Sequence, residues 1–400
     1  MANNNNKDKC NVPNLRFPEF SGEWEMSSIG EQFELYSGNT PSRMNKNQFD
    51  GSINWITSGE LKEHYISDTK EKISEEAAKN NSLKLLPVGT FVIAIYGLEA
   101  NGVRGTCSIT TRESTISQAC MAFTSKMDIQ NEFLYSWYKK HGNIIGIKYA
   151  QGTKQQNLSY DIIERFNISY PCMEEQKKLI RFISLIDQRI ATQNKIIEKL
   201  QSLIKGLNNT LQYDTGGKSV CLGDILLERS ERSQTNNQHE VLSSTVKGIF
   251  SQREYFSKDI ASENNVGYKI IRLHDVVLSP QNLWMGNINY NDRFEIGIVS
   301  PSYKVFSIAD GYDNQFVAAM LKTHRALYSY MMVSEQGASI VRRNLNMEAF
   351  SQLVFKIPSL DKQREIGYAI SLLKSQLKTA NKIIKAYTSQ KQYLLRQMFI

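Results

Sequence analysis

The sequence predicts an α+β chain with two similar mixed α/β domains in a pseudo-two-fold arrangement, separated by two long helices that pack as an antiparallel coiled coil. Three observations predict this fold. One segment recurs without gaps at an offset of 187 residues, the separation between Pro171 and Pro358. Both copies carry apolar residues at the 3.5-residue period that is typical of coiled-coil helices. A polar, glycine-rich stretch at 211–218 marks a junction between the two halves.

Residues 1–14 are predicted to be a disordered tip without the apolar stretch of a signal peptide. The longest apolar runs, such as FVIAIYGL at 91–98, are too short to span a bilayer, so a cytoplasmic protein is expected. The five cysteines are scattered without a CxxC pair, and the five histidines lack metal-binding spacing, so we expect reduced thiols and no metal site. A net charge of +8 and a pI near 9.0 permit a polyanionic partner without requiring one.

The first domain is predicted at 15–170. Its segment LPVGTFVIAI at 86–95 is typical of a buried strand, and a helix is expected at 131–142. Trp55 is expected in the core. The domain opens with Ile-Gly-Glu at 29–31, which has a weak counterpart in Leu-Gly-Asp at 222–224.

The two long helices are predicted at 171–212 and 358–400. Each begins at a proline, where the missing N–H costs nothing. Each helix is about 60 Å long at 1.5 Å per residue, and neither can bury its apolar stripe alone, so we expect the two to pack together. The alternative is that each is an amphipathic helix on its own domain. The stripe runs over 179–211 and 366–398 and includes Ile183, Ile190, Ile197, Ile204, Ile370, Leu377, Ile384 and Leu394.

The second domain is predicted at 213–357 and repeats the first more weakly. IRLHDVVLSP at 271–280 parallels the buried strand at 86–95, and SPSYKVF at 300–306 parallels SQACMAF at 117–123. The loop at 336–346 parallels the loop at 151–159, with two residues inserted. One helix is expected over 314–332.

Several phrases of the chain resemble the specificity subunits of Type I restriction-modification systems. They are LRFPEFSGEW at 15–24, Ile-Gly-Glu at 29–31, SGNTPS at 37–42, WITSGEL at 55–61 and IVSPSYKVF at 298–306, together with the IP…KQREI type of helix start. The resemblance covers nearly the whole chain. The second domain departs from it, because it opens with SVCLGDILLER and lacks a GNTP counterpart.

The resemblance implies that each globular domain is a target recognition domain that reads one half of a bipartite, asymmetric DNA site. It also implies that the helices set the spacing between the half-sites and dock two methyltransferase subunits. Half-sites about one duplex turn apart, some 34–36 Å, are within reach of such a spacer. Restriction subunits would join through the complex, and the partners would bring S-adenosylmethionine, ATP and Mg²⁺.

Candidate DNA-binding residues are those whose side chains suit base edges or phosphates. In the first domain they are Thr40, Arg43, Thr57, Lys62, Asn101, Arg104, Lys154, Gln155, Gln156 and Asn157; in the second they are Gln281, Asn282, Arg342, Arg343 and Asn344. The alternatives are turn chemistry at 37–43 and 56–62 and solvated surface loops elsewhere. Trp284 is expected in the core rather than as a surface for base stacking.

Catalytic motifs are not found in the sequence. It contains no Pro-Pro, which the flipped-base motif of a methyltransferase requires. The GGKS at 216–219 lacks the first glycine of a phosphate-binding loop, because Gln212 stands there. We therefore expect a non-catalytic DNA-recognition subunit. The alternatives are a coiled-coil scaffold for proteins that reads no sequence, and the specificity part of a fused restriction-methylation enzyme.

Overall fold

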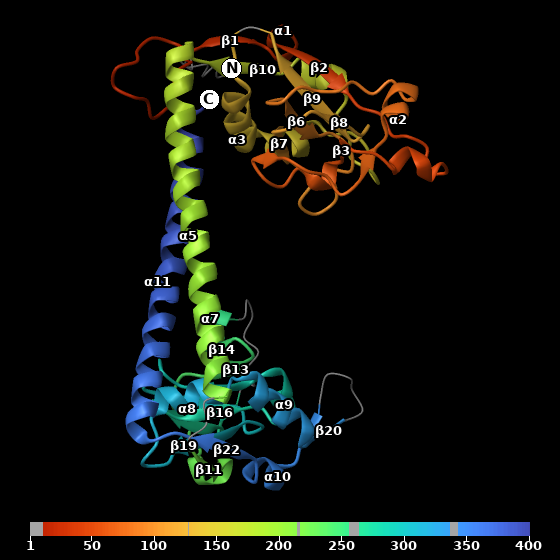
Figure 1. Cartoon of the computed structure of the whole chain (residues 1–400). Coiled ribbons are helices and arrows are strands. Elements are labelled where there is room, and N and C mark those ends of the chain that lie inside the picture. Colours follow the sequence, from red (N-terminus) through yellow and green to blue (C-terminus); the bar gives the residue numbers. More distant parts are fainter. Residues whose placement is uncertain (1–10, 127, 214–216, 256–263, 337–342) are drawn as a thin grey trace. The chain divides into compact units, whose positions relative to one another are not determined.

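A computed structural model describes residues 11–126, 128–213, 217–255, 264–336 and 343–400. The chain forms two compact units. The first contains residues 1–193 and 383–400, and the second contains residues 194–382. Each unit therefore combines one globular domain with one part of each long helix (Figure 1).

The first unit is built on a five-stranded sheet of order β2-β9-β6-β7-β4, in which β4 and β7 are parallel and the other neighbours are antiparallel. A three-stranded sheet of order β5-β3-β8 and the pair β1-β10 complete it. The strands are β1 (Glu25–Ser28), β2 (Phe33–Ser37), β3 (Ile53–Ile56), β4 (Tyr65–Ile66), β5 (Lys72–Ile73), β6 (Phe91–Ala94), β7 (Cys107–Thr110), β8 (Ser114–Ile116), β9 (Cys120–Ser125) and β10 (Asn167–Tyr170). The helices are α1 (Ile29–Gln32), η1 (Lys46–Phe49), η2 (Ser58–Glu60), α2 (Glu75–Asn80), α3 (Asn131–Tyr149) and α4 (Tyr160–Glu164).

The core of the first unit lies between this sheet and α3. Every residue of β6 is buried, which confirms the buried strand predicted there. The helix predicted at 131–142 is also confirmed, and it continues to Tyr149. Trp55 is 1% exposed, as expected for a core residue. Burial raises the pKa of the Cys107 and Cys120 thiols to about 12, so both are neutral packing groups.

The second unit contains a four-stranded antiparallel sheet of order β12-β19-β16-β17 and the pairs β11-β22, β13-β14, β15-β18 and β20-β21. Its strands are β11 (Lys218–Cys221), β12 (Leu226–Arg229), β13 (Leu242–Thr245), β14 (Gly248–Ser251), β15 (Lys269–Arg272), β16 (Val276–Leu278), β17 (Ile288–Tyr290), β18 (Ile296–Val299), β19 (Lys304–Ile308), β20 (Ser334–Gln336), β21 (Arg343–Leu345) and β22 (Val354–Ile357). Its helices are α6 (Leu222–Ile225), α7 (Gln252–Tyr255), η3 (Leu283–Met285), α8 (Asn314–Met320), α9 (His324–Met332) and α10 (Met347–Ser351).

The two units repeat one topology, as the weak sequence duplication predicts. The order β2-β9-β6-β7 in the first sheet corresponds to β12-β19-β16-β17 in the second. The globular domain of each unit also begins with a strand, a one-turn helix and a strand, namely β1-α1-β2 and β11-α6-β12. The opening strand pairs in each case with the strand that directly precedes a long helix, β10 or β22.

A glycine lies in the same place in both one-turn helices. A Cβ on Gly30 would come within 2.4 Å of Glu164 Cγ on α4. A Cβ on Gly223 would come within 3.0 Å of Ser351 Cβ on α10. Glycine therefore permits a close approach of the opening helix to a second short helix in both units.

The long helices are α5 (Met173–Tyr213) and α11 (Leu360–Met398). Every predicted stripe position over 179–207 and 366–398 is buried or half-buried, while most flanking positions are exposed. The side chain of Leu211 lies outside the described residues. In the first unit, Leu179 and Ile183 share a core with Leu394 and Met398, and Lys391 Nζ lies 2.5 Å from Asp187 Oδ1. The start of α5 thus packs beside the end of α11, which is the predicted antiparallel direction.

Two predicted elements of the second unit are wrong. The single helix expected over 314–332 is two helices, α8 and α9, because Thr323 caps a new helix by accepting a hydrogen bond from Ala326 N (3.2 Å). The single strand expected at 271–280 is β15 followed by β16. Between them His274 has a φ of 76°, and Asp275 Oδ2 accepts a hydrogen bond from Arg272 N (2.7 Å), which closes a turn.

Within the described part of the chain, no helix has both the length and the apolar character needed to cross a membrane.

Candidate nucleic-acid interface

The two candidate loops of the first unit, 96–106 and 150–159, lie against each other. The first connects β6 to β7, and the second follows α3. Leu98 N donates a hydrogen bond to Gln156 O (3.0 Å), and Gln156 N donates to Glu99 Oε2 (2.8 Å). Gly97 N donates to Asn157 Oδ1 (3.3 Å). Residues far apart in the sequence thus form one continuous surface of two loops.

The candidate side chains on this surface fall into two groups. Arg104 Nη2 donates to Gln156 Oε1 (2.5 Å), so these two groups hold the loops together. Asn101, Lys154 and Gln155 are exposed. The exposed group therefore has donors and acceptors available for a partner, whereas Arg104 and Gln156 act on each other.

The candidates nearer the N-terminus have local structural roles. The guanidinium of Arg43 pairs with the Glu71 carboxylate (Nη2 to Oε2, 2.8 Å) and lies 4.8 Å from the ring centroid of Phe49. That pairing raises the pKa of Arg43 and lowers the pKa of Glu71. Thr57 caps the helix η2, with its Oγ1 2.9 Å from Glu60 Oε2.

Thr40 and Lys62 complete this N-terminal set. Thr40 is half-buried and its backbone N donates to Asn39 Oδ1 (2.8 Å). Lys62 is exposed. The structure brings none of the four N-terminal candidates into contact with the two loops through a described hydrogen bond or ion pair.

The second unit brings its own candidate loops together in the equivalent place. The loop 279–287 connects β16 to β17, the counterparts of β6 and β7. Arg343 N on β21 donates to Gln281 O in this loop (3.1 Å). The Arg343 guanidinium lies 5.3 Å from the Trp284 ring centroid and donates to Met331 O and Ser334 O at 3.3 Å. Arg343 therefore joins the loops of the second unit, as Arg104 does in the first.

The other candidates of the second unit differ in accessibility. Gln281 and Asn344 are exposed, and Asn282 is half-buried. Trp284, expected in the core, is half-buried beneath Arg343. Arg342 lies outside the described residues.

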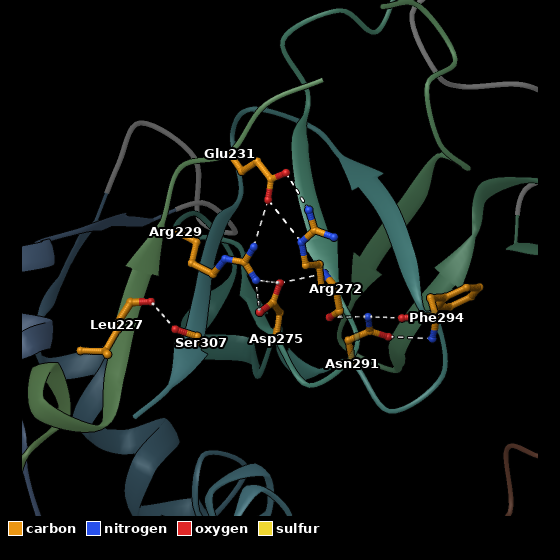
Figure 2. A network of polar contacts seen from close by, with 8 residues as sticks. All are labelled: Leu227, Arg229, Glu231, Arg272, Asp275, Asn291, Phe294 and Ser307. Atoms are coloured by element: carbon orange, nitrogen blue, oxygen red, sulfur yellow. Dashed lines mark hydrogen bonds and ion pairs between the residues drawn. The ribbon is translucent and has the colours of Figure 1, made fainter. Parts of the chain in front are cut away.

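A charged network on the second unit was missed by the sequence analysis (Figure 2). Arg229 Nη1 lies 3.0 Å from Asp275 Oδ1, and Glu231 accepts from both Arg229 (3.0 Å) and Arg272 (2.8 Å). Asp275 is 4% exposed in its side chain while Arg272 is 46% exposed. The acidic groups thus orient two guanidinium groups at the surface. The alternating charges of LLERSER at 226–232 are a sequence signal for it.

Comparison with known proteins shows what the chain is similar to. Residues 21–202 match the family model described as Type I restriction modification DNA specificity domain. Over this segment the chain is similar to the specificity subunits of Type I restriction-modification systems.

Two characterised specificity chains show the extent of the relationship. The chain is 29% identical over 284 residues to the Type I restriction enzyme MjaIX specificity subunit of Methanocaldococcus jannaschii, covering 65% of this chain and 64% of that one. It is 27% identical over 203 residues to the EcoR124I/EcoR124II specificity subunit of Escherichia coli, covering 50% and 48%. The matches thus span less than two thirds of the relatives' own lengths.

Solved structures of this type share the fold. The Type-I restriction-modification system S subunit from M. genitalium superposes with a TM-score of 0.60 at 15% identity, covering 97% of this chain and 99% of that chain. A chain from a study of complex assembly and conformational transition of the type I R-M system gives a TM-score of 0.54 at 12% identity, covering 94% and 97%. At these sequence identities the similarity to the solved structures shows the fold alone.

Proposed function

We propose that this specificity chain reads a bipartite DNA site without catalysing a reaction itself. Each globular domain would bind one half-site through its pair of converging loops. The observation that carries the proposal is the equivalence of the two loop pairs. In each pair one loop connects corresponding strands, β6 to β7 or β16 to β17, and an arginine joins that loop to the second loop. Two loop pairs with the same position in the fold but different exposed side chains could bind two half-sites of different sequence.

The long helices would serve as the spacer between the half-sites and as the docking surface for two methyltransferase subunits. Their shared apolar stripe supports this role, because helices joined side by side resist bending more than one helix does. A pseudo-two-fold relation between the domains would let equivalent loops meet the two half-sites from opposite directions. The partner subunits would supply S-adenosylmethionine, ATP and Mg²⁺, and restriction subunits would join through them.

The test begins by mapping methylated adenines in cells that carry the system, which defines the site. Binding of the full chain with its methyltransferase partner is then measured at fixed salt on duplexes with either half scrambled. We expect each scrambled half to weaken binding by at least ten-fold. Equal binding to intact and doubly scrambled duplexes would instead favour a protein scaffold that does not read sequence.

A paired substitution separates the two loop surfaces. Lys154→Ala with Gln155→Ala is expected to weaken binding to the intact site and to remove discrimination in one half only. Lys79→Ala, an exposed lysine on α2 of the same unit, is the matched control because it keeps the change in charge and lies outside the loops. An equal effect of both variants would show that only overall charge matters.

A further inference from the structure

The second unit contains a cavity of about 340 Å³ that no predicted role accounts for. It lies among the β13-β14 turn, the end of β17, α8 and α11. Its described lining includes the cationic side chains Lys247, Arg293, Lys322 and Lys374, and Asp292 is the one acidic residue among the described lining residues. Such a lining favours a negatively charged ligand.

Lys322 is fixed at the wall of this cavity. Its Nζ donates to Gly286 O (2.6 Å) and to Asn289 Oδ1 (2.8 Å). An ammonium group has three protons, so a third remains for a ligand. Asn289 is itself held, because its Nδ2 donates to Ser244 Oγ (2.7 Å) and Thr245 O (2.8 Å), and Asn289 and Ser244 are buried. The ammonium is therefore positioned before any ligand arrives.

The second cation comes from a separate element. Lys374 lies on α11 and shares the cavity wall with Lys322. Burial, together with the nearby charge of Lys374, lowers the pKa of Lys322 to about 8. Lys374 is exposed. The positive charges of the two lysines repel each other, and an anion between them would relieve that repulsion.

Arg293 contributes at the edge of the cavity. Its Nη2 donates to Glu254 Oε1 (2.8 Å), and its guanidinium lies 4.8 Å from the Phe294 ring centroid. The charge of Arg293 is therefore partly compensated by Glu254. Among the described lining residues, Lys247, Lys322 and Lys374 form no ion pair with an acidic side chain, and Lys322 is the one held by hydrogen bonds at the wall.

We propose that this cavity is a binding site for a phosphate group, with Lys322 and Lys374 as its principal ligands. A phosphate has several acceptor oxygens and can accept from both ammonium groups at once, and lysine binds phosphate as a point charge. The phosphate is either a free anion or part of the DNA backbone. Only the assignment to DNA rests on the proposed function.

The test measures inorganic phosphate binding to the full chain by calorimetry, with chloride keeping the ionic strength constant. Lys374→Gln is the main variant, because no described hydrogen bond depends on its Nζ. Lys378→Gln is the matched control, since it removes the same charge one turn along α11 and does not line the cavity. We expect Lys374→Gln to weaken phosphate binding about ten-fold, as for a lost charge-assisted hydrogen bond, and Lys378→Gln to leave it within two-fold.

A second arm identifies the source of the phosphate. The slope of log affinity for cognate DNA against log salt is compared among the same proteins. A slope smaller by about one unit in Lys374→Gln alone assigns a DNA phosphate. Lost phosphate binding with an unchanged slope assigns a free anion, and a chain that binds phosphate without binding DNA leaves this site standing while the proposed function fails. No phosphate binding together with an unchanged slope would overturn the proposal.

Discussion

The two units share one strand arrangement and differ in the side chains of their loops. The strand order and the opening strand-helix-strand segment are the same in both. The loop junction differs: Arg104 bonds to the Gln156 side chain in the first unit, whereas Arg343 lies over Trp284 in the second. The second unit alone is assigned a cationic cavity. Backbone pairing preserves the fold while the loop side chains differ, so one architecture can carry two different loop surfaces.

The largest expected effect is on the packing of the long helices. Ile183 and Ile370 are equivalent positions, 3% and 1% exposed. Ile183→Ala and Ile370→Ala should each lower the free energy of unfolding by about 2–5 kcal/mol. Chemical unfolding followed by hydrogen exchange in each unit measures this. If the units are energetically independent, each substitution destabilises its own unit, and equal loss in both units for either variant would contradict that independence.

The two opening glycines should differ in tolerance. Gly30→Ala brings a Cβ into conflict with Glu164 Cγ, whereas Gly223→Ala meets the looser contact with Ser351. We expect a loss of about 1–3 kcal/mol for Gly30→Ala and a smaller loss for Gly223→Ala. Thermal unfolding compares them directly. Gly59→Ala, where no atom lies within 4 Å of the added Cβ, serves as the control; an effect of Gly30→Ala no larger than this control would argue against the close approach.

The loop junctions should differ in their sensitivity to loss of the arginine. Arg104→Lys is expected to weaken DNA binding by about 1–2 kcal/mol, because it removes the side-chain hydrogen bond from Arg104 to Gln156 that helps to hold the two loops together. Arg343→Lys should act similarly through its backbone contacts and Trp284. Competition binding on duplexes with one half altered reports which domain is affected. Loss of reading in the opposite half would contradict the assignment of one loop pair to one half-site.

Lys322 is expected to contribute a pH dependence to the stability of the second unit. The folded-state pKa of Lys322 is about 8 against an ordinary value of 10.5. Between these values the unfolded chain binds more protons, so this lysine makes stability rise with pH over that window. Below about pH 8 both states are protonated and the contribution is flat. The free energy of unfolding is measured between pH 7 and 10.5 for the wild-type chain and for Lys322→Met, and it should rise more steeply with pH in the wild type.

The sequence predicts the parts of this fold that depend on periodicity. The apolar stripe of α5 and α11 repeats every 3.5 residues, and its positions from Leu179 to Leu207 are all buried or half-buried. β6 is apolar throughout and is a central strand. Both features can be predicted because each depends on the spacing of apolar residues within one segment and on the burial of those residues.

Sequence reasoning fails where a single side chain ends an element. The break between α8 and α9 depends on the Thr323 cap, and the turn before β16 depends on Asp275. In both segments the apolar residues continue on either side of the break, so their spacing does not indicate where one element ends and the next begins. The loop residues were predicted as candidates, but the division into exposed Lys154 and engaged Arg104 depends on contacts between distant segments. The cavity with Lys322 and Lys374 draws on four separate elements, which no local pattern reports.

The pairing of β1 with β10 and of β11 with β22 has a consequence for how such chains can change. The first and last strands of each globular domain are hydrogen-bonded to each other. The segment between them therefore starts and ends at the same place in the structure. If that whole segment is replaced at once, the pairing of the first and last strands is kept, and so is the position of the long helix that follows the last strand. Exchange of a whole domain therefore disturbs the rest of the chain less than changing it one residue at a time.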